Sequence, residues 1–190
     1  GGAGLRAAIS AREGGADVLL VSKSRPGYGN NTAIAGGAFA TAGGWREPRD
    51  NPQVYKQDAL RSGRFINNER LVEVMAEGSV RQVGDLERYG VNLARTEGAL
   101  RVSHVPGHTY PRHVGSVEHS GAGLSVPLRR HALGLGVRFL EGVVVTRLAK
   151  KGNTVTGGLG VDERTRFYDL RARATVLATG GLGRLYRQTN

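Results

Sequence analysis

The chain has 190 residues, enough for one hydrophobic core with a small additional element, and no apolar run approaches the roughly 18 residues that would span a bilayer. Cysteine is absent, which excludes disulfides, thiolate metal sites and cysteine nucleophiles, and without a charged-then-apolar leader we expect a cytoplasmic protein. The formal net charge of +11 suggests nucleic-acid binding, but the basic residues are scattered, lack interleaved aromatic residues and form no recognised motif, so we expect a solvated surface and no nucleic-acid partner.

The first predicted element is a helix that starts at the very beginning of the chain. Leu5, Ala8 and Ile9 have the i, i+3, i+4 spacing of an apolar helical stripe, and only glycine-rich sequence precedes them. With two further residues ahead of it, this start would read G-x-G-x-x-G, the turn that lets a backbone approach a pyrophosphate. We therefore expect the chain to begin inside that motif, with the preceding strand missing.

A buried parallel strand and a glycine-rich stretch follow. The run Ala16–Val21 is short and almost continuously apolar, as in a strand covered on both faces. The stretch from Pro26 to Gly44 is too small and loose to fill a core, so it is either a flexible loop or backbone lying against a ligand.

Two helices are predicted next. Asn51 followed by Pro52 is a helix start, and that helix should end near Gly63. A second helix should end at Gly90, and its apolar stripe is interpreted as core rather than as a binding face. The stripe consists of Val72, Met75, Ala76, Val83 and Leu86.

Residues 96 to 120 are irregular and contain four histidines, His104, His108, His113 and His119. Their spacing is irregular, glycines and prolines intervene, and no carboxylate cluster joins them, so we expect no metal site. Arg112 or His113 could instead approach a substrate, and the alternative is a surface or cofactor-side loop.

The last third should contain one helix and several strands. The helix is expected from Gly121 to about Leu133. The strands are expected at Val137–Leu140, Val143–Leu148, Thr154–Val161, from about Phe167, and at Ala174–Ala178. The final strand leads directly into Thr179, Gly180 and Gly181, a second turn of small residues at which backbone can approach a ligand. Two such turns suit a large cofactor better than a single phosphate.

Together these stretches resemble the FAD-binding domain of the fumarate reductase, succinate dehydrogenase and L-aspartate oxidase flavoproteins. The resemblance covers essentially the whole chain. It rests on five segments: Gly1–Ala8; Ser22 with Lys23; Ala33–Gly37; Leu86–Gly90 with Arg95–Gly98; and Ala174–Gly181 followed by Tyr186.

The resemblance implies an α/β fold, a Rossmann-like FAD-binding domain with a parallel central sheet. It implies one partial domain over residues 1–190, with a helical insertion at 45–95 and a small β-meander at 143–172. The N-terminal strand, the C-terminal part and the capping substrate domain would be missing. A V-x-V-[IV]-G-x sequence is expected upstream and a G-D-G sequence soon after Asn190.

The resemblance also implies which residues bind FAD. The helix start would bind the pyrophosphate, Ser22 and Lys23 the ribose, and the following loop the pyrophosphate and isoalloxazine. Asn30 stands where covalent members carry the histidine joined to flavin, so dissociable FAD is expected. Val144 would contact adenine through its backbone or simply pack in its strand. The predicted residues are Gly1, Gly2, Ala3, Gly4, Ser22, Lys23, Asn30, Asn31, Thr32, Ala35, Gly36, Gly37, Val144, Ala178, Thr179, Gly180 and Gly181.

The implied activity is hydride transfer between flavin and a dicarboxylate-type substrate such as fumarate, succinate or aspartate. The family's catalytic residues lie beyond this chain, so no catalytic residue is assigned and the chain alone should be inactive. An electron-transfer subunit or domain is a possible partner, and membrane association would come through such a partner. The alternatives are a flavin-binding electron-transfer or degenerate relative without turnover and, less favoured, a basic nucleic-acid-binding module.

Overall fold

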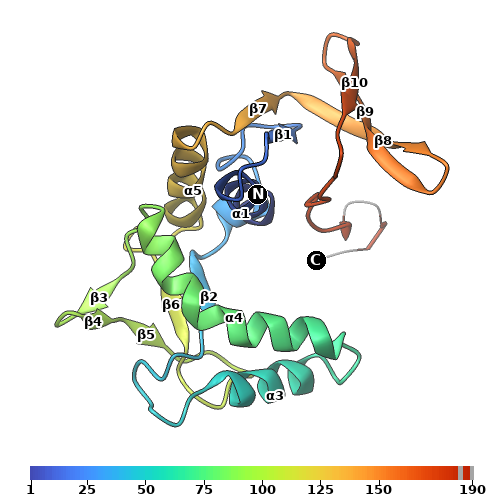
Figure 1. The fold of residues 1–190 in the computed structure, drawn as a ribbon. Helices are drawn as coiled ribbons and strands as arrows, with labels where there is room; N and C mark the ends of the chain where they lie inside the picture. The colour runs from blue at the N-terminus through green and yellow to red at the C-terminus, as the bar shows by residue number, and fades with distance from the viewer. Residues whose placement is uncertain (184–185, 189–190) are drawn as a thin grey trace. The chain divides into compact units, whose positions relative to one another are not determined.

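A computed structural model describes residues 1–183 and 186–188. Its contacts divide the chain into two compact units, one formed by Gly1–Ile34 with Leu128–Asn190 and the other by Ala35–Pro127 (Figure 1). The expected insertion at 45–95 and meander at 143–172 stay predictions as domain boundaries. Among the described residues, no helix is long and apolar enough to cross a bilayer.

The first unit begins with helix α1 (Gly2–Glu13) and the parallel strand pair β1 (Leu19–Ser22) and β7 (Arg138–Glu141). Leu5 and Ile9 are fully buried, which confirms the predicted apolar stripe of the helix. In the strand pair, Leu20 lies opposite Phe139. A single helical turn, α2 (Asn31–Ile34), follows β1, and helix α5 (Ala122–Gly134) precedes β7.

The same unit contains an antiparallel meander of β8 (Val143–Lys151), β9 (Thr154–Asp162) and β10 (Phe167–Arg171), with β9 in the centre. The three strands lie close to their predicted positions. A Cβ on Gly157, at φ +145°, would collide with the carbonyl of Leu170 on β10. The meander therefore needs glycine at this position of its central strand.

The predicted strand over Ala174–Ala178 is wrong, because the structure shows no strand there. Val176 and Leu177 are 71% and 63% exposed. A strand needs a neighbour to accept and donate its backbone hydrogen bonds. Among the described residues β1 pairs only with β7, and none pairs with the 174–178 segment.

The second unit contains two helices, α3 (Pro52–Ser62) and α4 (Glu69–Arg88), which pack together. Both predicted helices are confirmed. The Asn51 side chain caps α3 by accepting from the amides of Gln53 and Val54, as that residue type is expected to do. Met75 is a correction to the predicted stripe: it is 45% exposed, so it lies at the margin of the buried face of α4 rather than in the core.

A small antiparallel sheet completes the second unit. Its strands are β2 (Ala38–Ala40), β6 (His113–Gly115) and β5 (Val102–Ser103), with β6 in the centre. A separate hairpin is formed by β3 (Arg95–Thr96) and β4 (Ala99–Leu100). The sheet and α4 share a core, whose buried members are Val83, Val91, Leu93, Val102 and Val114. The chain is thus an α/β protein with a parallel strand pair and antiparallel sheets, as predicted.

Candidate functional site

The glycine turn at the start of α1 is held by a side chain thirty positions along the chain. The amide of Gly2 donates to Oγ1 of Thr32 over 3.0 Å. A Cβ on Gly1 would lie 3.0 Å from that oxygen, and one on Gly2 would lie 3.1 Å from Cγ2 of the same threonine. Because both distances are shorter than most Cβ contacts, a side chain at either position would require Thr32 to shift.

Asn30 supplies an unpartnered donor beside this turn. Its Oδ1 accepts from the amide of Ala33 over 3.1 Å and so caps α2, but its Nδ2 is buried without a hydrogen-bond partner among the described residues. The first amides of a helix also have no acceptor within the helix, and within residues 1–183 and 186–188 no side chain caps this helix at Gly1, so the amides of Ala3 and Gly4 can donate to a ligand. Burying an unsatisfied donor is costly, so this donor set fits an anionic group such as a pyrophosphate.

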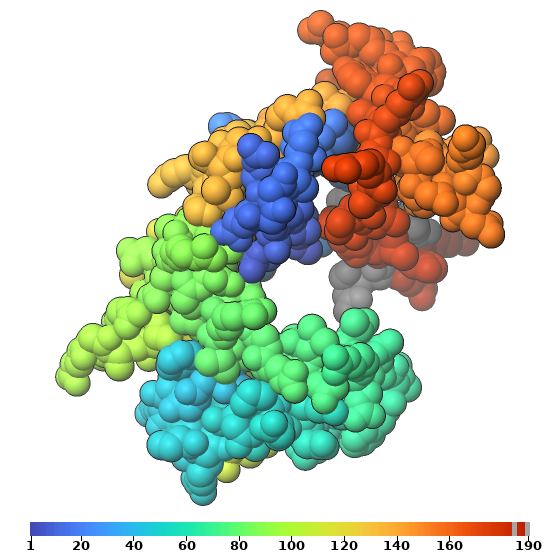
Figure 2. All heavy atoms as spheres, in the orientation of Figure 1, coloured from blue at the N-terminus to red at the C-terminus, as the bar shows by residue number. Residues whose placement is uncertain are grey.

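The two ends of the described chain meet at this helix. A Cβ on Gly4 would lie 3.5 Å from the Cβ of Ala178. Figure 2 shows the same neighbourhood as the red C-terminal segment beside the blue N-terminal helix. Thr179, Gly180 and Gly181 follow Ala178 and are exposed. The structure therefore brings Gly4 and Ala178, from the first and last predicted cofactor segments, together in one unit.

Ser22, Lys23 and Val144 lie elsewhere in the first unit. Ser22 ends β1 opposite Glu141, and its hydroxyl accepts from the amide of Ser24 at the long distance of 3.4 Å. The side chain of Lys23 is exposed. Val144 pairs with Val161 in the meander and is 46% exposed, so its backbone takes part in strand pairing. Strand β1, which ends at Ser22, contacts both α1 and β8.

The remaining predicted segment, Ala35–Gly37, belongs to the second unit and is fixed there by backbone contacts. The carbonyl of Ala35 accepts from the amide of Gly121 over 2.8 Å, and that of Gly37 accepts from Ser116 over 3.1 Å. Gly37 has φ +72°, and a Cβ there would collide with the backbone of Ser120. This part of the glycine-rich loop is therefore a shaped backbone, not a flexible linker.

A buried ionic cluster in the second unit was not predicted from the sequence. Arg112 is fully buried and pairs with Asp50 over 2.7 Å and with Asp58 over 3.0 Å, while its guanidinium carbon lies 4.8 Å from the centre of the Tyr55 ring. Burial raises the pKa of Asp50 despite the neighbouring arginine. Burial alone would also raise the pKa of Asp58, but hydrogen bonds from Thr109 and the charge of Arg112 lower it. Arg112 is thus a structural cation, which corrects the alternative that it approaches a substrate.

The four histidines are placed in two groups. His104, His108 and His113 lie near Arg112, whereas His119 contacts Arg101. Within residues 1–183 and 186–188, no group of three or more histidine, aspartate or glutamate side chains is arranged to hold a metal ion.

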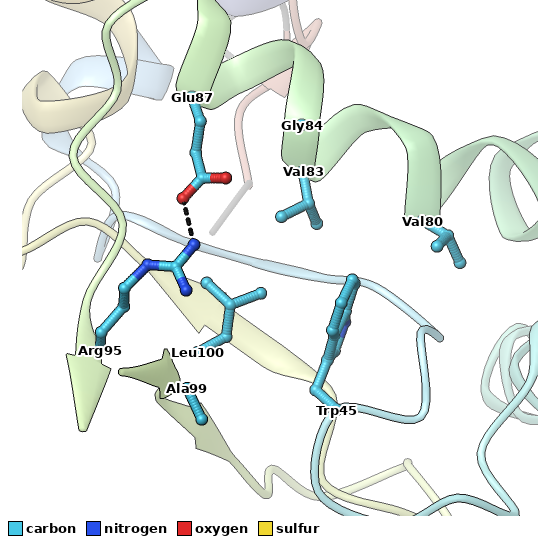
Figure 3. A pocket seen from close by; sticks show the side chains of 8 residues that line it. All are labelled: Trp45, Val80, Val83, Gly84, Glu87, Arg95, Ala99 and Leu100. Carbon is cyan, nitrogen blue, oxygen red and sulfur yellow. Dashed lines mark hydrogen bonds and ion pairs between the residues drawn. The ribbon is translucent and has the colours of Figure 1, made fainter. Parts of the chain in front are cut away.

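A shallow cavity of about 360 Å³ opens in the second unit beside the only tryptophan (Figure 3). Apolar side chains from α4 form one wall and Trp45 faces them, while the ion pair of Glu87 and Arg95, 2.6 Å long, stands at the rim. The lining residues are Trp45, Val80, Val83, Gly84, Glu87, Arg95, Ala99 and Leu100. The sequence carries no signal for this cavity, because its walls come from segments far apart in the chain.

Comparison with known proteins agrees with the geometry. The family model described as an FAD binding domain matches residues 1–190. The chain is 32% identical to a fumarate reductase (CoM/CoB) subunit of Methanothermobacter marburgensis, covering 100% of this chain and 35% of that protein. It is 31% identical to L-aspartate oxidase of Pyrococcus abyssi, covering 98% of this chain and 37% of that protein.

Solved structures give the same result. The Mycobacterium smegmatis Sdh1 complex in its apo form matches with a TM-score of 0.90 and 33% identity, over 96% of this chain and 33% of the other. The E. coli quinol fumarate reductase chain FrdA matches with a TM-score of 0.90 and 26% identity, over 98% of this chain and 32% of the other. The chain thus spans about a third of the length of these relatives. It belongs to the FAD-binding domain family that fumarate reductases, succinate dehydrogenase flavoprotein subunits and L-aspartate oxidases share.

Proposed function

We propose that this chain is the FAD-binding part of a flavoprotein oxidoreductase that transfers hydride between flavin and a dicarboxylate-type substrate. The observation that carries the proposal is the donor set at the start of α1, where the buried Nδ2 of Asn30 has no partner in the described part of the chain and lies beside a glycine turn closed by Thr32. The approach of Ala178 to Gly4 adds the second turn to the same region. Family membership supports FAD as the ligand.

The proposed roles follow from what each residue offers. The amides of Ala3 and Gly4 and the amide group of Asn30 would bind the pyrophosphate, and the positive end of the α1 dipole would favour its charge. Ser22 and Lys23 would contact the ribose. Bound FAD supplies hydride donation and acceptance at the flavin, while the chain supplies orientation and charge. The other predicted cofactor residues, from Asn31 through Gly181, stay proposals in the same sense.

We further propose that FAD is held non-covalently. Asn30 stands at the position of the family's flavin-linked histidine, and a carboxamide cannot form that bond. Its two side-chain atoms are suited to other tasks in the structure: Oδ1 caps α2 and Nδ2 is available as a donor. Acid precipitation of the complete protein should therefore release all of its flavin into the supernatant.

The substrate and partners that we propose for the whole protein are inferred from its relatives. Two of them are named as subunits, one of a fumarate reductase and the other, a flavoprotein, of a succinate dehydrogenase. We propose a small dicarboxylate-type substrate, an electron-transfer subunit or domain as partner, and a cytoplasmic location with any membrane contact made through that partner.

The proposal is tested by flavin binding and turnover in the complete protein. Asn30→Asp replaces the buried donor with a carboxylate, and loss of one hydrogen bond to a charged group predicts a roughly 10- to 100-fold weaker FAD affinity. Asn153→Asp makes the same change in the exposed turn between β8 and β9 and should leave FAD affinity unchanged. Tight NAD binding without flavin would refute the cofactor. Intact FAD binding with no activity on fumarate, succinate or aspartate would instead favour a relative without turnover.

A further inference from the structure

A chain of hydrogen bonds runs from the buried arginine of the second unit through two histidines. Nη1 of Arg112 lies 3.3 Å from Nδ1 of His108, and Nε2 of His108 lies 3.3 Å from Nε2 of His113. The two imidazole rings meet edge to face with their centres 5.0 Å apart. Nε2 of His104 contacts the carbonyl of His108 over 2.7 Å, which ties the segment between these residues together.

The hydrogen-bond partners determine which ring nitrogens of His108 and His113 carry a proton. A guanidinium can only donate, so Nδ1 of His108 must accept and carries no proton. A neutral His108 then has its proton on Nε2, which donates to Nε2 of His113. His113 in turn must have its proton on Nδ1. The geometry therefore requires both rings to be neutral, each in one defined tautomer.

We propose that the His108–His113 pair is an acid-sensitive catch that holds the segment from His104 to His113 in place on α3. A proton added at Nδ1 of His108 would face the N–H of Arg112. One added at Nε2 of His113 would face the N–H of His108. Either protonation turns a hydrogen bond into a repulsive contact between two donors and releases the segment.

The charged and titratable groups around the pair come from three parts of the second unit. Arg112 and His104 belong to the same segment as the pair. Asp58 and Tyr55 lie on α3, with the Tyr55 ring 5.8 Å from His108, and Arg61 reaches Asp58 from the next turn of that helix. Asp50 precedes α3 and pairs with Arg112.

These surroundings determine the direction of the pH response. Burial first, and then the charge of Arg112, lower the pKa of His113 below 6.5. The same two causes, together with His113 and against the pull of Asp58, lower the pKa of His108. A histidine whose folded-state pKa is lowered contributes stability that is present above its unfolded value and is lost as the pH falls toward the folded one. The catch should hold above about pH 6.5 and weaken below it.

The two carboxylates cannot produce this response. The pKa of Asp50 is raised in the folded state, so its titration favours the closed form as the pH falls. Asp58 has a lowered pKa, and its stabilisation is lost only below its ordinary value of 3.8. A loss of structure between pH 6.5 and 5 therefore reports the histidines.

Release of the catch would also affect the pairing of β6 with β2, the strand that follows the glycine-rich loop. His113 is the first residue of β6 and lies opposite Ala40 of β2, and the carbonyl of Arg112 accepts from the amide of Thr41 over 2.9 Å. Strand β2 directly follows Ala35–Gly37. We therefore expect acid to loosen this strand pair first.

The test combines histidine NMR with denaturation of the complete protein. In the wild type at pH 7.5, ¹⁵N spectra should show His108 protonated only on Nε2 and His113 only on Nδ1. Unfolding of the second unit can be followed by the fluorescence of Trp45, the only tryptophan. As the pH falls from 6.5 to 5 its unfolding constant should rise, by at most about two decades per pH unit for the two histidines, because unfolding lets each of them take up a proton.

Two substitutions keep the acceptors and remove the titration. Gln at position 113 places an amide oxygen near the site of Nε2, and Asn at position 108 places one near Nδ1. His113→Gln should reduce the slope, and the double variant with His108→Asn should reduce it further, because each substitution removes one titrating ring. His119→Asn, in the pair with Arg101, is the matched control and should keep the wild-type slope. An unchanged slope in the double variant, or a proton on Nδ1 of His108 at pH 7.5 in the wild type, would overturn the proposal.

Discussion

Replacing Arg112 with methionine should destabilise the second unit by far more than the loss of one ion pair at a surface. The substitution keeps an unbranched chain of similar length but removes the guanidinium that neutralises Asp50 and Asp58 at 2.7 and 3.0 Å. The side chains of the two carboxylates are 2% and 1% exposed, so water cannot replace the lost partner. Breaking a buried pair by removing one member costs about 3–5 kcal/mol, and we expect a loss in that range.

Arg70→Met is the matched control in the same unit. Arg70 also forms a short pair, 2.8 Å from Glu73, but the two side chains are 75% and 34% exposed. Pairs of this kind contribute about 0–1 kcal/mol, because water and salt screen them. The free energy of unfolding of the second unit can be measured by urea titration of Trp45 fluorescence. If Arg112→Met cost no more than Arg70→Met, the assignment of Arg112 as a buried structural cation would be refuted.

Three further predictions concern single positions. Gly37→Ala should weaken FAD binding and lower the melting temperature, because φ +72° and the backbone of Ser120 leave no space for a Cβ. Gly78→Ala, in open space on α4, should instead stabilise the protein by about 0.5–1 kcal/mol. Thermal melts of both variants test these expectations. Burial alone would raise the pKa of Asp162, but hydrogen bonds from neighbouring arginines and a tyrosine lower it to about 2, and NMR titration should show this. The contribution of Asp162 to stability should be present above pH 3.8 and disappear as the pH falls toward 2. Asn51→Ala should cost about 1 kcal/mol in urea unfolding through loss of the α3 cap, and no measurable loss would contradict the capping geometry.

The parts of the fold that could be predicted from the sequence are those determined by residues close together in the chain. Asn51 with Pro52 determines where α3 begins, and glycine after the last apolar turn marks where α3 and α4 end. The strand expected at Ala174–Ala178 has the same kind of local signal, an apolar β-branched run, but a strand also requires a neighbour, which its own sequence does not provide. The prediction for Met75 is wrong for a related reason. Helical spacing indicates which side of α4 is buried, but it does not indicate how far around the helix the buried side extends.

The same distinction between local and distant residues applies to the candidate site. Its glycines could be recognised because close backbone approach leaves few alternatives, and the contact between Gly4 and Ala178 agrees with that interpretation. The ionic cluster could not be predicted, because Asp50, Asp58 and Arg112 come from separate segments and each looks like an ordinary surface residue in the sequence. Charge pairs over such separations become visible only when the fold brings the segments together.

The hydrogen bond from Gly2 to Thr32 has a consequence for how an anion meets the turn at the start of α1. The entropy of ordering that backbone is lost when the protein folds, before any ligand arrives. An incoming anion therefore meets a turn that is already ordered, and its binding free energy is not reduced by the need to order it. Thr32→Val would remove the acceptor of this hydrogen bond, so FAD should bind more weakly than it does to the wild type.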